Sequence, residues 1–135
     1  MRLWFSRFLI GTVFLFNVQC AVSFWWSPQR YAPAYELAGE VGNATLRGFA
    51  VLFLMWNVPY AIAFWHPVKN RLSLWEAVIM QGIGVIGETA LVSLLPAGHD
   101  VLRTSLNRFI TFDGFGFILL LIAAGCCGFP VRKRL

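Results

Sequence analysis

Charged residues are scarce in this chain. Only 13% of its 135 residues are Asp, Glu, Lys or Arg, and only six residues are acidic. Soluble domains carry about 25% charged residues, so the composition excludes an ordinary soluble domain and indicates a membrane protein. The net charge of +5 does not indicate nucleic-acid binding, because the cations are scattered in short loops and tails without a basic stripe.

Motifs for catalysis and metal binding are also missing. Cys20, Cys126 and Cys127 match no CxxC, CxxCH or zinc-type spacing, and they fit small buried apolar residues better. His66 and His99 fall at opposite membrane faces of the predicted helices, so they do not share a metal or a haem. No Ser-His-Asp arrangement, HExxH or phosphate loop occurs. We therefore predict no catalytic residue, no metal site and no cofactor, while a bound lipid, quinone or pigment stays open.

Long apolar runs, in contrast, dominate the sequence. Four segments are close to the roughly 20 residues that cross about 30 Å of hydrocarbon, and they cover approximately residues 3–26, 46–65, 72–95 and 109–129. A proline follows each segment, where it ends a helix without breaking one. The pattern predicts an all-α polytopic membrane protein. Residues 1–135 would form a single four-transmembrane-helix bundle with short loops.

The positive charges indicate how the bundle is oriented. Most Lys and Arg residues lie at the two termini and in the loop at 67–72, and fewer lie on the opposite side. Loops rich in Lys and Arg stay in the cytoplasm. We therefore predict cytoplasmic N- and C-termini, in a bacterial inner (plasma) membrane. The connection at 27–45 mixes tyrosines and aliphatic residues with glutamates, and it is predicted to be a short interfacial segment.

Glu88 is the most informative residue, because it lies inside the third apolar segment. A carboxyl group at the centre of a membrane helix costs about 2.5 kcal/mol or more, so it usually faces the protein interior or a cavity. Gln81 and Gly84 share its helical face. Polar residues of two other segments are expected at nearby depths, with Arg47 or Arg108 as the nearest cation. The predicted polar network comprises Arg47, Asn57, Gln81, Glu88, Arg108 and Asp113.

Two interpretations of this network are open. It could be a buried set of partners that fixes the order and register of the helices, which we favour, or the floor of a pocket for a ligand. Trp56, at mid-helix, could line such a pocket or face lipid. The run Gly82–Gly87 matches G-x-G-x-x-G, but no strand precedes it. It is therefore interpreted as a helix-packing surface and not as a dinucleotide site.

The layout resembles that of the DoxX-like group of small membrane proteins. The resemblance is carried by four short-looped helices, by Arg47-Gly48 opening the second, and by Arg108 with Asp113-Gly114 opening the fourth. It implies a four-helix bundle, often associated with redox or quinone-linked partners. The cysteine pattern of some redox members is absent. The sterol-isomerase-like group is an alternative with the same architecture.

Two functional classes follow. The first is an accessory or structural subunit of a larger membrane complex, redox or quinone-linked, with other membrane-protein subunits and lipids as partners and without catalysis of its own. The second is a binder of, or an enzyme acting on, a lipophilic ligand such as a quinone, pigment or lipid. In the second class the ligand would occupy an intramembrane pocket around Glu88.

Overall fold

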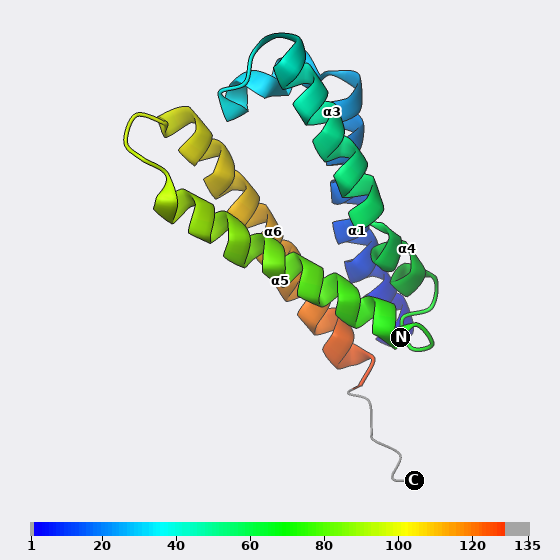
Figure 1. The fold of residues 1–135 in the computed structure, drawn as a ribbon. Coiled ribbons are helices and arrows are strands. Elements are labelled where there is room, and N and C mark those ends of the chain that lie inside the picture. Colours follow the sequence, from blue (N-terminus) through cyan, green and yellow to red (C-terminus); the bar gives the residue numbers. More distant parts are fainter. Residues whose placement is uncertain (1, 129–135) are drawn as a thin grey trace.

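Helices make up nearly all of the part of the chain that the structure, a computed structural model, describes (residues 2–128). They are α1 (Arg2–Trp26), α2 (Pro28–Tyr31), the 3-10 helix η1 (Ala32–Tyr35), α3 (Gly39–Trp56), α4 (Val58–Trp65), α5 (Arg71–Leu94) and α6 (Asp100–Cys126) (Figure 1). Four spans, one of them formed by α3 and α4 together, are long and apolar enough to cross a membrane. The predicted all-α class is confirmed, and the protein is an integral membrane protein.

Two helices begin earlier than the apolar segments that predicted them. α3 begins at Gly39 instead of near residue 46, and α6 begins at Asp100 instead of near residue 109. The first turns of both helices are polar. A prediction from hydropathy therefore leaves these polar turns out of the apolar segment, although the helical backbone hydrogen bonds continue through them. The predicted end of the last segment, near residue 129, and the basic tail at 132–134 lie outside the described residues.

The second span is interrupted at Asn57. This residue separates α3 from α4, and its side-chain Nδ2 donates a hydrogen bond to the Phe53 carbonyl at 2.7 Å. Pro59 follows in the first turn of α4, where its missing N–H is tolerated. The interruption changes the neighbours of the span: α3 packs on α1, whereas α4 packs on both α1 and α5.

The closed half of the bundle is the end where α4, the first half of α1, the first half of α5 and the last half of α6 meet (Figure 1). Tyr60, Leu74 and Leu120 are completely or almost completely buried there. Small residues allow the helices to approach closely. The core of this half consists of Leu9, Ile10, Val13, Tyr60, Ala63, Leu74, Ala77, Val78, Leu120, Ala123, Ala124 and Cys127.

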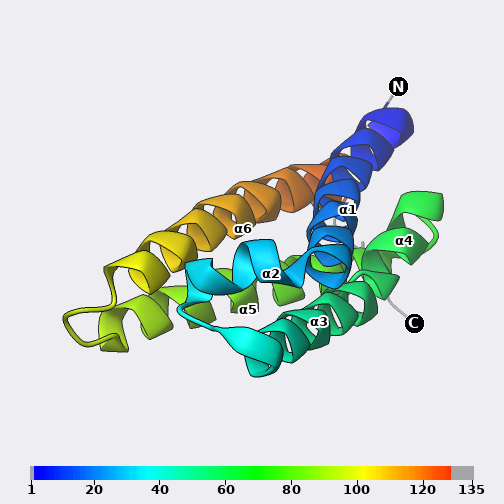
Figure 2. The ribbon, with the colours of Figure 1, turned by 90° about the horizontal axis from the view of Figure 1, so that it is seen from above.

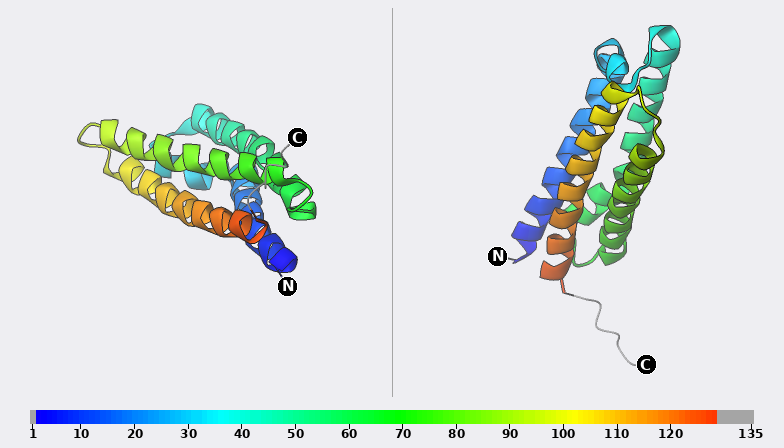
Figure 3. Two further views of the ribbon diagram at one scale, coloured as in Figure 1. Left: turned by 90° about the horizontal axis from the view of Figure 1, so that it is seen from below. Right: turned by 90° about the vertical axis from the view of Figure 1, so that its left-hand side faces the viewer.

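The open half is the opposite end, where α3 diverges from the α5–α6 pair (Figures 1 and 2). A second, smaller core joins α1, α3 and η1 there, formed by Ala21, Phe24, Ala32, Leu46 and Ala50. The segment α2–η1 lies at the end of this half and also contacts α6. The N-terminus and the end of α6 lie together at the closed end of the bundle (Figure 3).

Candidate functional site

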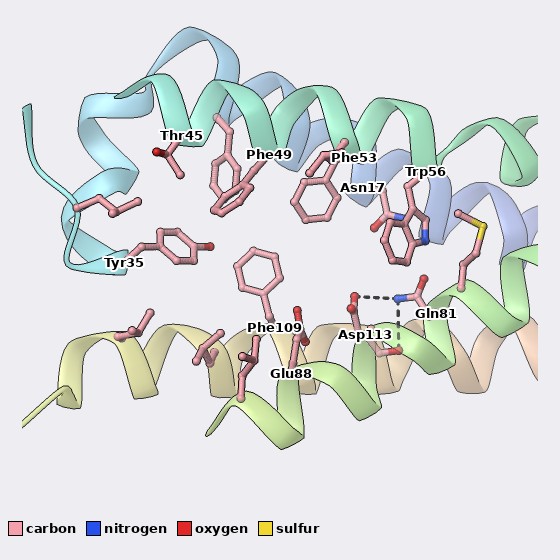
Figure 4. Close-up of a pocket in the computed structure, with 18 of the residues that line it drawn as sticks. Asn17, Tyr35, Thr45, Phe49, Phe53, Trp56, Gln81, Glu88, Phe109 and Asp113 are labelled. Atoms are coloured by element: carbon pink, nitrogen blue, oxygen red, sulfur yellow. Dashed lines mark hydrogen bonds between the residues drawn. The ribbon is translucent and has the colours of Figure 1, made fainter. Parts of the chain in front are cut away.

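A cavity of about 530 Å³ occupies the open half, between α3 and the α5–α6 pair (Figure 4). It exists because α4 joins α5 while α3 does not pack against it. Its lining is overwhelmingly apolar, with a few polar groups toward the closed half. The lining residues are Asn17, Phe24, Tyr35, Leu37, Thr45, Phe49, Leu52, Phe53, Trp56, Met80, Gln81, Gly84, Glu88, Leu91, Leu95, Leu102, Leu106, Phe109 and Asp113.

A chain of hydrogen bonds forms the inner wall of the cavity. The Tyr60 hydroxyl donates to Gln81 Oε1 at 2.5 Å, and Gln81 Nε2 donates to Asp113 Oδ1 at 2.8 Å (Figure 4 shows the second bond). Because the Gln81 oxygen accepts from Tyr60, its amide nitrogen must face Asp113. The chain connects α4, α5 and α6 at the boundary between the two halves, and it fixes the position of the Asp113 carboxyl group.

Two glycines make room for this chain. A Cβ atom added at Gly84 of α5 would lie 2.5 Å from Asp113 Oδ2, and one added at Gly116 of α6 would lie 2.9 Å from Gln81 Nε2. Each glycine thus faces the polar side chain of the opposite helix. Gly82 lies against Phe117 of α6 in the same way. These contacts support the helix-packing interpretation of the run at 82–87.

Two other polar side chains in the cavity lack partners. Glu88 points into it (Figure 4), and its buried Oε2 has no hydrogen-bond partner among residues 2–128. Asn17 of α1 is only 4% exposed, lines the cavity, and makes no side-chain hydrogen bond within the described part of the chain. Buried polar groups are normally hydrogen-bonded. Two unpaired groups facing one cavity therefore indicate a site that an additional polar group can satisfy.

Aromatic rings form the other walls. The rings of Phe53 and Phe109 stack across the cavity with their centroids 6.1 Å apart, and Tyr35 and Phe24 pack around Phe109 at 6.1 Å and 6.4 Å. Trp56 stands on α3 near the inner wall (Figure 4). The indole therefore lines the pocket, which settles the choice between the two positions that the sequence allowed.

The predicted polar network is only partly brought together. Gln81, Glu88 and Asp113 line the cavity. Asn57 is buried, but its side chain bonds to its own helix and it does not line the cavity.

The two arginines that were expected to balance Glu88 lie elsewhere. Arg47 is exposed, and Arg108 is exposed beside a separate cavity of about 280 Å³. Among residues 2–128, no ion pair joins either guanidinium to Glu88 or Asp113. Both arginines lie on the helices predicted for them. Their side chains, however, are exposed and do not line the cavity that contains Glu88, whereas the predicted network required them to do so.

Glu36, which follows η1, and His99, which precedes α6, are hydrogen-bonded to each other at the end of the open half; we call this pair the clasp. His99 Nδ1 donates to Glu36 Oε2 at 2.5 Å, and the Leu102 N–H donates to Glu36 Oε1 at 3.3 Å. The hydrogen bond from His99 holds the pKa of Glu36 below its ordinary value. Burial raises the pKa of the neighbouring Tyr35, whose ring faces the cavity. The clasp joins η1 to the beginning of α6 above the cavity.

Asn17, Tyr35 and Tyr60 contribute to the site but were not among the predicted site residues. Asn17 could have been found, since an amide within an apolar span is itself unusual. The tyrosines gave no comparable signal, because Tyr is common near membrane interfaces.

Comparison of the chain with protein-family models, with curated proteins and with solved structures finds no match. The four apolar spans and the cavity define the class: a helical integral membrane protein with a cavity between its helices.

Proposed function

We propose that this protein binds a lipophilic molecule in the cavity of the open half, with a polar end of that molecule at Glu88 and Asn17. The observation that carries the proposal is the pair of unpartnered polar groups in a cavity whose other walls are apolar and aromatic. Ligand pockets share this pattern of extensive apolar lining with a few convergent polar groups. The volume of about 530 Å³ lies within the range of such pockets, about 300 to 1,000 Å³.

The energetics support a binding role over a purely structural one. A buried polar group without a hydrogen bond costs about 1–3 kcal/mol. Glu88 adds no contact between helices that would offset this cost, whereas Asp113 is held by Gln81. A ligand that hydrogen-bonds to Glu88 would recover the lost interaction. The carboxyl group is therefore better explained by an occupant than by the packing of the bundle.

The position of the cavity indicates how a lipophile enters. Leu52 of α3 and Leu91 of α5 line the cavity and are 54% and 56% exposed. We infer that the opening between these two membrane-spanning helices faces the hydrocarbon of the membrane. A ligand dissolved in the bilayer would enter sideways, without crossing water.

The role of accessory subunit, with other membrane-protein subunits as partners, stays a prediction from the sequence. The exposed faces of α5 and α6 carry many apolar side chains, but lipid alone requires such a surface. The DoxX-like resemblance and its quinone-linked partners likewise stay predictions. A quinone is one of the lipophiles that extraction would identify.

The test is to purify the protein in a mild neutral detergent and to extract and identify bound small molecules. Leu91→Trp places bulk in the cavity and should remove the extracted lipophile. Leu94→Trp places the same bulk on an outward position that is 79% exposed and does not line the cavity, and it should leave the lipophile in place. Equal lipophile content in the two variants would contradict the proposal. Co-purifying protein subunits without any lipophile would favour the accessory role instead.

A further inference from the structure

Among residues 2–128, acidic side chains line the cavity and basic ones do not. Glu88 and Asp113 are the ionisable carboxyl groups of the lining, and within the described residues no Lys, Arg or His lines it. The cations predicted to be nearest, Arg47 and Arg108, are exposed and do not line it. An anionic ligand end would therefore meet two acidic groups without a counter-ion. A cationic end would supply the charge that the cavity lacks.

The aromatic walls carry the same preference. The faces of aromatic rings bear partial negative charge, and a cation within about 6 Å of a ring centroid is attracted by about 0.5 to 2 kcal/mol. Six rings surround the cavity: Phe24, Tyr35, Phe49, Phe53, Trp56 and Phe109. Carboxylates combined with such rings form the kind of environment that holds quaternary ammonium groups.

The unpartnered groups point to a ligand independently of charge. Asn17, 4% exposed, presents its amide to the cavity, and Glu88 presents an unpaired carboxyl oxygen. Asp113 Oδ1 already accepts a hydrogen bond from Gln81, so it contributes charge more than new hydrogen bonds. Glu88 is thus the principal acceptor for an incoming donor, and Asp113 is the second charge.

We propose that the lipophilic occupant is an organic cation, a protonated amine or a quaternary onium group carried on an apolar body, with its charge between Glu88 and Asp113 and its apolar body among the aromatic rings. This inference rests on the proposed function and specifies the chemical class of its ligand. No covalent step is involved, since the cavity holds the cation by charge and ring contacts alone.

The test compares two probes of the same shape and opposite charge, tetraphenylphosphonium and tetraphenylborate. Their equilibrium binding to the full-length protein in a neutral detergent is measured, together with that of a neutral lipophile, menadione. We expect tetraphenylphosphonium to bind at least about tenfold more tightly than tetraphenylborate. Glu88→Gln and Asp113→Asn should each weaken phosphonium binding by about tenfold or more.

Matched controls separate this charge recognition from general effects. Glu76→Gln removes the same charge from an exposed position about 18 Å away on the same helix, and it should leave phosphonium affinity unchanged. Binding of the borate as tight as that of the phosphonium, or unchanged phosphonium affinity in both Glu88→Gln and Asp113→Asn, would overturn the inference. If either of these results is found but menadione binds to the wild type and not to Leu91→Trp, the proposed function stands and only the cation preference fails. If no probe binds, both proposals fail.

Discussion

The closed half and the open half of this bundle are built from the same four spans, but the helices pack closely in the first and surround a cavity in the second. In the closed half, Ala63, Ala77 and Ala123 are completely buried, and the helices touch along their small faces. In the open half, the same helices carry Phe53, Phe109 and other large rings, and these surround a cavity. The comparison shows that buried alanines accompany the close approach of α4, α5 and α6 in the closed half. In the open half, aromatic rings fill part of the space between α3 and α6.

The boundary between the halves is where polarity is concentrated. Before the interruption at Asn57 the second span packs on α1 and not on α5, and after it the span packs on both α1 and α5. At the same depth, Tyr60, Gln81 and Asp113 form their hydrogen-bonded chain. The chain seals the closed half and presents a carboxyl group to the open half. Packing and ligand recognition thus share one layer of residues.

The largest expected effect contrasts a leucine from each half of α6. Leu120→Ala removes a side chain that is completely buried in the closed half and should lower the free energy of unfolding by about 2–5 kcal/mol. Leu106→Ala trims a side chain that already faces the cavity, and it should cost clearly less. Thermal melts in detergent compare them. Equal destabilisation would show that the open half is packed as tightly as the closed half.

A smaller effect is expected at the glycines of α5. Gly84→Ala would bring a Cβ atom to 2.5 Å from Asp113 Oδ2 and push this carboxyl group out of its bond to Gln81. Forced overpacking costs about 1–3 kcal/mol, and ligand affinity should fall with it. Gly87→Ala meets nothing within 4 Å and should be neutral or slightly stabilising. A melt in which both variants behave like wild type would place Asp113 elsewhere.

The third prediction is that a substitution of Glu88 changes stability and ligand binding in opposite directions. Glu88→Leu removes an unpaired carboxyl group from the cavity, so it should raise the free energy of unfolding by about 1 kcal/mol while abolishing ligand binding. Glu88→Gln should lie between wild type and Glu88→Leu in stability. Had Arg47 or Arg108 paired with Glu88, leucine would instead be strongly destabilising. A lower melting temperature for Glu88→Leu than for wild type would instead indicate that Glu88 is paired with one of these arginines.

The smallest effect concerns the clasp between Glu36 and His99. The pKa of Glu36 in the folded protein is lowered from its ordinary value of 4.5, chiefly by the hydrogen bond from His99. The clasp therefore stabilises the folded state above this ordinary pKa, and its contribution is lost as the pH falls through the lowered value. Glu36→Gln should lower the melting temperature by no more than about 2 °C at neutral pH. The difference should shrink and vanish as the pH falls through the lowered pKa of Glu36; a difference that grows as the pH falls would contradict the sign.

The sequence predicted the four spans because hydropathy and helix length are properties of local segments. Helical spacing also placed Gln81 and Glu88 on one face. The cavity itself was not predictable in detail, because it depends on how far the interruption at Asn57 turns α3 away from α5. Nor did depth along the axis determine the direction of Arg47 and Arg108. That direction is fixed by which small residues pack, a contact between distant segments that local patterns do not contain.

The most direct test of the intramembrane site is to map where a lipophilic amine that carries a photoreactive diazirine attaches to the protein in lipid bilayers. We expect mass spectrometry to find the label on cavity residues of α3 and α5 such as Phe53 and Leu91, and tetraphenylphosphonium to compete with it. Ile79, Ile83 and Ile86, which are exposed on α5 and do not line the cavity, should carry only background label. Label spread equally over these isoleucines and the cavity residues, without competition, would contradict a binding site in the cavity of the open half.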